Sequence, residues 1–145
     1  MTDVKNEMRA VVKERQLDHP PEKVWRALTQ KHLVGEWLME CDFEAEPGHE
    51  FELQASWGTV ACMVLAVEPP KFLSYSWQAH GLDSVVTWTL TNTETGTHLR
   101  MEQTGFGMDQ EQAYRGATAG WNNFLGRLEQ VLSNQVSNLS KGASR

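Results

Sequence analysis

A few side chains in the chain could act on a bound carbonyl group. Tyr75, His80 and Gln103 offer a hydroxyl, an imidazole and an amide, and each can polarise such an oxygen. His80 follows a strand-like run and precedes Gly81, so we expect it at the mouth of any pocket formed there. Acid–base catalysis needs a positioned pair of groups, and none is evident in the sequence. We therefore favour ligand binding over catalysis and assign no catalytic residue.

Motifs for covalent, phosphate and metal chemistry are absent from the sequence. There is no nucleophile elbow, P-loop, dinucleotide-binding glycine motif or HExxH pair. The five histidines lack metal-ligand spacing, and Cys41 and Cys62 form no CxxC motif. We expect no metal, no cofactor and two free thiols.

The net charge of −6 comes from one region of the chain. Residues 36–52 carry seven carboxylates and no Lys or Arg. Such a cluster can bind Ca²⁺ or Mg²⁺, but the acidic residues of 40–46 alternate with Cys41, Phe43 and Ala45, as on a strand with one wet face. We therefore expect a solvated face. The 13 Lys and Arg form no basic patch, which disfavours nucleic acid as a partner.

The sequence contains no segment that predicts insertion into a membrane or export. No apolar run reaches the roughly 18 residues of a transmembrane helix, and residues 1–15 lack the apolar core of a signal peptide. Two free thiols suit a reducing compartment. We expect a cytoplasmic protein that is not embedded in a membrane.

The elements that position these groups follow from hydrophobic periodicity. A strand is predicted over 8–17, followed by short helices over 21–28 and 31–37. Six strand-like runs follow, separated by Gly and Pro turns: 40–44, 50–55, 59–67, 72–79, 85–92 and 98–105. A long amphipathic helix is predicted over about 110–136.

This order of elements predicts the architecture. Strands joined without intervening helices form an antiparallel sheet, and its apolar face must be covered by the apolar face of the last helix. We predict an α+β fold, with a curved antiparallel sheet wrapped around a long C-terminal helix and two short helices after the first strand. We expect one domain over 1–145, a core of about 8–132 and a frayed tail over 133–145.

The chain has six tryptophans, and strand alternation places several of them on the inner face of the sheet. Tryptophan is seldom fully buried and its indole N–H needs a partner, so the inner face fits either a filled core or a small-molecule pocket. The predicted pocket residues are Trp37, Trp57, Met63, Tyr75, Trp77, His80, Trp88, Met101, Gln103, Phe106, Trp121 and Phe124.

The long helix contains two glycines beside its apolar face. Gly116 and Gly120 lie one turn apart, and each costs about 1 kcal/mol relative to alanine inside a helix. We favour a role in close approach of the helix to the sheet, with local opening of the helix for a ligand as the alternative.

Short motifs spread along the chain share their order and spacing with a known family. They begin with HPPEKVWRALT at 19–29 and continue at 33–37, 47–48, 57–60, 68–73, 77, 96–99, 104–106 and 120–121. Together they resemble the SRPBCC/START-like superfamily, in the branch homologous to the activator of Hsp90 ATPase (the AHSA1 type). The resemblance implies a helix-grip fold, also called START/Bet v 1-like, with a deep apolar cavity.

The resemblance also implies a class of function. Members of the superfamily bind lipids, polyketides, flavonoid-like compounds or other hydrophobic molecules, and some are cyclases or hydrolases. Our first hypothesis is binding of a small hydrophobic, aromatic or lipid-like ligand in an internal cavity. The second is a protein-interaction module with Hsp90 as the chaperone partner, through residues 36–52. The third is a cyclase or hydrolase that uses Tyr75, His80 or Gln103 in the same cavity.

Overall fold

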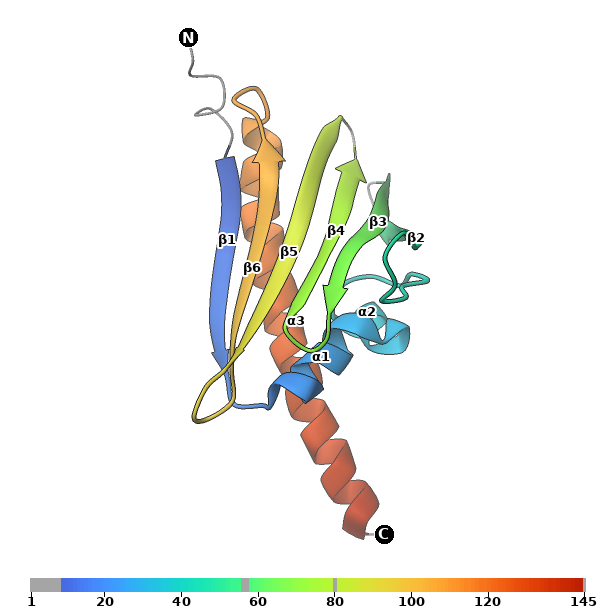
Figure 1. The fold of residues 1–145 in the computed structure, drawn as a ribbon, viewed down its shortest axis with the longest axis vertical. Helices are drawn as coiled ribbons and strands as arrows, with labels where there is room; N and C mark the ends of the chain where they lie inside the picture. Colours follow the sequence, from blue (N-terminus) through green and yellow to red (C-terminus); the bar gives the residue numbers. More distant parts are fainter. Residues whose placement is uncertain (1–8, 56–57, 80, 145) are drawn as a thin grey trace.

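The computed structural model describes residues 9–55, 58–79 and 81–144, with side chains described through Asn134. The elements in chain order are β1 (Arg9–Leu17), α1 (Pro21–Thr29), α2 (Lys31–Trp37), β2 (Glu50–Ala55), β3 (Gly58–Glu68), β4 (Phe72–Ala79), β5 (Leu82–Asn92), β6 (Thr97–Phe106) and α3 (Glu111–Ser144). Figure 1 shows the sheet on one side, α3 lying across it, and α1 and α2 at one end.

The sheet is antiparallel with the strand order β1-β6-β5-β4-β3-β2. Consecutive hairpins lead from β2 to β6, and β1 closes the row beside β6. With the long C-terminal helix on its curved face, this is the predicted helix-grip fold.

Alternation along the strands sets the inner face as predicted. On β5 and β6 the residues Val86, Trp88, Leu99 and Met101 are at most 1% exposed, while their neighbours in sequence are partly exposed. In α3 the buried residues recur at helical spacing: Trp121, Leu125, Leu128 and Leu132. The core therefore lies between this helical face and the inner face of the sheet.

The α3 helix packs along the β1 edge of the sheet and against α1 and α2. Arg9 of β1 forms an ion pair with Glu111 in the first turn of α3 and lies 4.2 Å over the Tyr114 ring. Further along, Arg15 Nε lies 3.2 Å from Glu129 Oε2. These contacts join β1 to α3 at two points along the helix.

The strand predicted over 40–44 is wrong, because this segment is a loop. Phe43 is buried, with its ring 5.0 Å from that of Phe51, which explains the alternation in the sequence. The turn after it bonds to β3, with Gly48 N–H donating to Val64 O (2.8 Å) and Val64 N–H to His49 O (2.9 Å). Pairing of 40–44 with β2 would also set the acidic side chains of both segments side by side, which is unfavourable.

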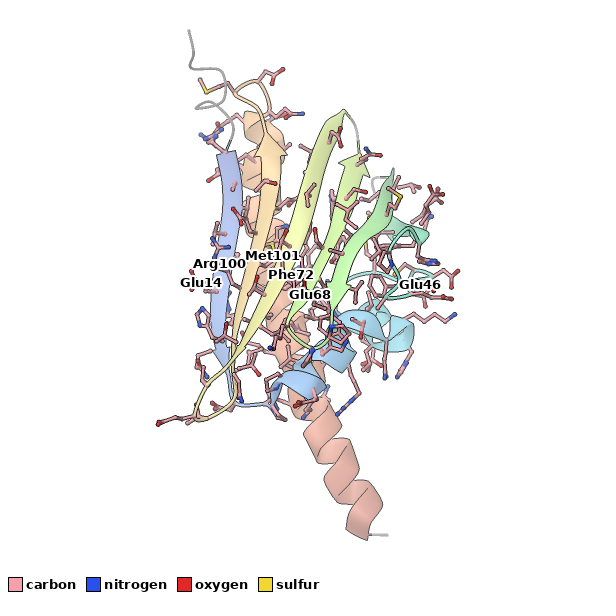
Figure 2. The ribbon with its side chains drawn as sticks, viewed as in Figure 1. Glu14, Glu46, Glu68, Phe72, Arg100 and Met101 are labelled. Atoms are coloured by element: carbon pink, nitrogen blue, oxygen red, sulfur yellow. The ribbon has the colours of Figure 1, made fainter. Side chains whose placement is uncertain are left out.

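The seven carboxylates of 36–52 are all exposed, as expected for a solvated face. Figure 2 shows Glu46 projecting from the loop that leads into β2, away from the sheet. Lys31 Nζ lies 3.2 Å from Asp42 Oδ1. No group of three or more His, Cys, Asp or Glu side chains within the described ranges could hold a metal ion.

The α3 helix continues to Ser144, beyond the predicted end near Val136. The segment expected to fray is therefore helical up to that residue. Its Ser, Asn, Gln and Lys residues are tolerated in a helix, and it contains no proline. A polar composition alone does not end a helix.

A bulge bends β6 just before α3 begins. Arg9 pairs with Phe106 and Ala10 with Thr104, so Gly105 is the extra residue. Its φ is +117°, and an added Cβ would lie 2.6 Å from Asp83 O. Only glycine fits this position without strain.

Replacing Gly105 with alanine should lower the free energy of unfolding by about 2 kcal/mol or more, because it combines an unfavourable φ with a backbone clash. Gly116→Ala in α3 is the matched control, since a Cβ there would meet no atom within 4 Å. The control should raise the free energy of unfolding by about 0.5–1 kcal/mol through helix propensity. Urea unfolding measures both values, and a neutral Gly105→Ala would contradict this account of the bulge.

Candidate functional site

A cleft of about 1060 Å³ lies between the first half of α3 and the part of the sheet away from β1. Its sheet side is formed by the ends of β2 and β4, the start of β5 and one residue of β6, and Leu38 and Met39 after α2 close one end. Because α3 packs along β1 and against α1 and α2, it leaves this part of the inner face uncovered.

The helix side of the cleft is a strip of small residues. Ala113, Gly116, Ala117 and Gly120 face the cleft at helical spacing. A Cβ added at Gly116 would meet nothing within 4 Å, and one at Gly120 would meet only Phe124 of the same helix, at 3.9 Å. The expectation that these glycines allow close approach to the sheet is therefore wrong, because they border open space.

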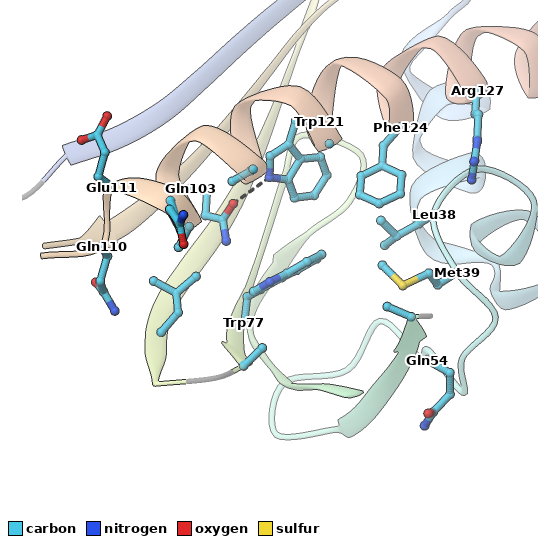
Figure 3. A pocket seen from close by; sticks show the side chains of 18 of the residues that line it. Leu38, Met39, Gln54, Trp77, Gln103, Gln110, Glu111, Trp121, Phe124 and Arg127 are labelled. Carbon is cyan, nitrogen blue, oxygen red and sulfur yellow. Dashed lines mark hydrogen bonds between the residues drawn. The ribbon is translucent and has the colours of Figure 1, made fainter. Parts of the chain in front are cut away.

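Aromatic rings line the cleft from both sides, Trp77 from the sheet and Trp121 and Phe124 from α3 (Figure 3). The ring centroids of Trp77 and Trp121 are 5.4 Å apart at an interplanar angle of 51°. Phe124 continues the row, with its ring 5.4 Å from that of Trp121. The cleft thus has large flat side chains next to a bare strip of helix backbone.

A chain of hydrogen bonds lies beneath these rings. Trp121 Nε1–H donates to Gln103 Oε1 (2.7 Å), and Gln103 Nε2–H donates to Ser84 Oγ (3.0 Å). The Ser84 hydroxyl then donates to Trp77 O (2.8 Å). Gln103 and Ser84 are each 1% exposed, so unmade bonds here would be costly and the chain fixes the side chains in place.

Charged groups lie only at the rim of the described lining. Asp109 lies two residues before α3, Glu111 is its first residue, and Arg127 lies at the opposite end of the cleft. The hydrogen bond from Arg9, with a second from Arg115, lowers the pKa of the Glu111 carboxyl below its usual value. Glu111 is therefore an ionised, paired carboxylate at neutral pH.

The structure separates the predicted pocket residues into groups. Trp77, Gln103, Trp121 and Phe124 line the cleft. Five others are buried in the core outside its lining: Trp37, Tyr75, Trp88, Met101 and Phe106. Trp57 and His80 lie outside the described residues.

Met63 lies on the outer face of the sheet and is 37% exposed. The buried residues of β3 are Val60, Cys62 and Val64, so the alternation points Met63 away from the cleft. Its placement in the pocket was wrong because every residue of this part of β3 is apolar, and the sequence does not distinguish the two faces.

Tyr75 is enclosed and cannot polarise a ligand in the cleft. Trp88 Nε1–H donates to its hydroxyl (3.0 Å), and the rings of Phe43 and Phe51 pack against it. Burial raises the pKa of Tyr75 above its usual value. Its role in the structure is that of a core residue with a satisfied hydroxyl.

The two cysteines are free thiols with raised pKa values. Burial raises the pKa of Cys62 to about 12 and that of Cys41 above its usual value. Both thiols are protonated at neutral pH, and a thiol is a far weaker nucleophile than a thiolate.

Several lining residues were not predicted from the sequence. Leu38, Met39, Ala79 and Leu82 lie at the ends of elements, where periodicity carries little information. The small residues of α3 did carry a signal, since they recur on one helical face. That signal fits both tight packing and open space, and only the position of the helix decides between them.

Comparison with known proteins agrees with this architecture. Protein MLL2253 from Mesorhizobium loti is 59% identical, with a TM-score of 0.84, and the match covers 87% of this chain and 98% of that one. Protein BH1534 from Bacillus halodurans is 31% identical, with a TM-score of 0.75 and coverage of 86% and 96%. DynU16, from the dynemicin biosynthetic locus, is 26% identical, with a TM-score of 0.77 and coverage of 86% and 47%.

No curated protein matches the chain. Within the described residues, no helix is both long and apolar enough to cross a membrane.

The family model described as activator of Hsp90 ATPase homolog 1-like protein matches residues 18–133. The match covers most of the 145 residues and the whole sheet from the end of β1 onward. The chain therefore belongs to the activator of Hsp90 ATPase homolog 1-like family, within the SRPBCC/START-like superfamily.

Proposed function

We propose that the chain binds a small, flat, hydrophobic molecule in the cleft between α3 and the sheet. The observation that carries this proposal is the cleft itself, about 1060 Å³ in volume, lined by the Trp77 ring from the sheet and by aromatic rings and glycine backbone from α3. Ligand pockets commonly measure about 300–1,000 Å³ and have mostly apolar linings with a few polar groups.

The shape of the cleft favours a flat ligand. A ring system could lie with one face against Trp77 of the sheet and the other toward Gly116 and Gly120 of α3, where no side chain intervenes. Stacking of aromatic rings adds about 0.5–1.5 kcal/mol to the gain from burial. A lipid-like chain would fill the same volume but would gain nothing from this stacking.

The chemistry of the described lining supports binding over catalysis. Its titratable side chains are Asp109, Glu111 and Arg127, and all lie at the rim. Glu111 is already held by Arg9 and Arg115. The similarity to DynU16 also supports a small-molecule role, since that protein comes from a biosynthetic locus.

Tryptophan fluorescence should report the ligand directly, because Trp77 and Trp121 lie in the cleft. In a titration against flavonoids, aromatic polyketides and fatty acids, we expect saturable quenching by the flat aromatic compounds. For a ligand of about 20 non-hydrogen atoms the Kd should be roughly 1–100 μM. Stronger quenching by fatty acids would indicate a lipid ligand instead of an aromatic one. No quenching by any compound in the panel would contradict the proposal.

A leucine at Gly120 should block the cleft without unfolding the protein. The new side chain enters open space, since the only atom that an added Cβ would meet within 4 Å belongs to the Phe124 ring, at 3.9 Å. We expect at least about a tenfold loss of affinity, because the leucine occupies volume that the ligand needs. Gly126→Leu is the matched control: it lies in the same helix, its Cβ would also meet nothing within 4 Å, and it is outside the cleft. Equal affinities for the two variants, measured by calorimetry, would place the ligand elsewhere.

A second candidate function is interaction with a chaperone, as the family description suggests. The exposed carboxylates of 36–52 are the observation that favours it, since they could pair with a basic surface. Under our primary proposal, the ATPase rate of purified Hsp90 should stay unchanged when this protein is added. A rate increase that disappears in a variant with Glu44, Glu46 and Glu50 changed to Gln would favour the chaperone partner instead.

A further inference from the structure

We propose that the cleft recognises an oxygen acceptor on its ligand, such as a ketone or quinone carbonyl, through the indole N–H of Trp77. This inference rests on the proposed function and specifies the chemistry of the ligand. It follows from the hydrogen bonds that three buried tryptophans make and from the lack of one for Trp77 within the described residues.

The indole N–H groups of three buried tryptophans are all satisfied within the protein. Trp37 Nε1–H donates to Ala27 O (2.7 Å), and Trp88 Nε1–H donates to the Tyr75 hydroxyl (3.0 Å). Trp121 Nε1–H donates to Gln103 Oε1 (2.7 Å). This is the usual state of a buried tryptophan, whose N–H normally finds a partner.

Trp77 is the exception among these buried indoles. It is 8% exposed, and no hydrogen bond of its N–H is found within the described part of the chain. Among the described residues, Arg9 Nε is the only side-chain nitrogen or oxygen that is fully buried and has no hydrogen-bond partner. The Trp77 nitrogen is not in that class, so it is not an unpaired donor enclosed in the core. Figure 3 shows the Trp77 ring projecting into the cleft opposite Trp121. Among the described residues, nothing competes with a ligand in the cleft for this N–H.

Gln103, two strands away from Trp77 in the sheet, supplies a second donor to the cleft. An indole N–H can only donate, so Trp121 must contact the amide oxygen of Gln103, and the amide nitrogen must face Ser84. One of the two N–H groups of that nitrogen bonds to Ser84 Oγ, and the other has no partner among the described residues. Ser84 in turn bonds to Trp77 O, so this chain of hydrogen bonds runs from β6 to β4, the two strands on either side of β5.

The nearby acceptors, in contrast, are already used. Gln103 Oε1 accepts from Trp121, Ser84 Oγ accepts from Gln103, and Trp77 O accepts from Ser84. This apolar surface therefore offers N–H donors and few acceptors. A ligand oxygen gains a hydrogen bond here, whereas a hydrocarbon of the same shape displaces water and leaves the donors unpaired, which is costly.

The test compares two probes of nearly identical shape, 9-fluorenone and fluorene, which differ in one carbonyl oxygen. Trp77→Phe keeps an aromatic ring and removes the N–H. We expect this variant to bind fluorenone about three- to tenfold more weakly than the parent chain, and fluorene within about twofold. Trp25→Phe is the matched control, since Trp25 is half-buried in α1 and does not line the cleft; it should change neither affinity. Isothermal titration calorimetry measures all six values.

A second measurement needs no variant at the site. In the ¹H–¹⁵N spectrum of the parent chain, the Trp77 indole resonance should move downfield with fluorenone and not with fluorene, while that of Trp25 stays in place. The indole peak is assigned by resonance assignment of the parent chain itself. This readout remains valid even if the variant is unstable.

The possible results distinguish failure of the acceptor inference from failure of the proposed ligand-binding function. If Trp77→Phe weakens both probes equally, or if both probes shift the Trp77 resonance alike, the ring contributes only stacking and the acceptor inference is overturned while the proposed function stands. If neither probe binds, or if Gly120→Leu binds them as well as the parent does, the proposed function fails and this inference fails with it.

Discussion

The structure depends on where α3 attaches to the sheet. The ion pairs Arg9–Glu111 and Arg15–Glu129 join the helix to β1, and the helix also packs against α1 and α2. Partly exposed ion pairs of this kind contribute about 0–1 kcal/mol each, whereas burial of a leucine such as Leu128 contributes about 1.5–3 kcal/mol. The apolar face therefore holds the helix on the sheet, and the ion pairs favour one position along the edge. A helix fixed to one edge of a curved sheet leaves the other half of the concave face uncovered, and the cleft occupies that half.

Trp121 connects this constraint to the cleft. It belongs to the buried face of α3, and its ring also borders the open space beside Trp77. Its bond to Gln103 joins α3 to β6 beneath the cleft. A buried amide is tolerated only when its hydrogen bonds are made, so Gln103 restricts Trp121 to one orientation. The same side chain thus anchors the helix and shapes the surface that a ligand would contact.

Local signals in the sequence were enough to predict most of the fold. The predicted bounds of α2, β2 and β4 agree with the structure, and for β2 and β4 the reason is that Gly and Pro turns delimit these strands. The inner faces of β5 and β6 followed from alternation. The site was less predictable: Trp77 and Trp88 point to the same side of the sheet, but only Trp77 borders the cleft. Alternation tells which face a residue occupies, whereas the distance from that face to the helix depends on long-range packing. The loop over 40–44 shows the same limit, since Phe43 alternates like a strand residue without a strand partner.

The small residues of α3 are the feature that stability alone does not explain. Gly116 and Gly120 each weaken the helix by about 1 kcal/mol relative to alanine, and neither gains packing in return, since an added Cβ would meet no part of the sheet. Gly126 is equally open and lies outside the cleft, so a glycine alone does not mark a site. What distinguishes Gly116 and Gly120 is their position in one strip with Ala113 and Ala117, all lining the cleft that holds Trp77. Larger side chains on that strip would fill the cleft and bury more apolar surface. A sequence selected only for stability would be expected to carry them, and their absence agrees with a cleft that is kept open for a ligand.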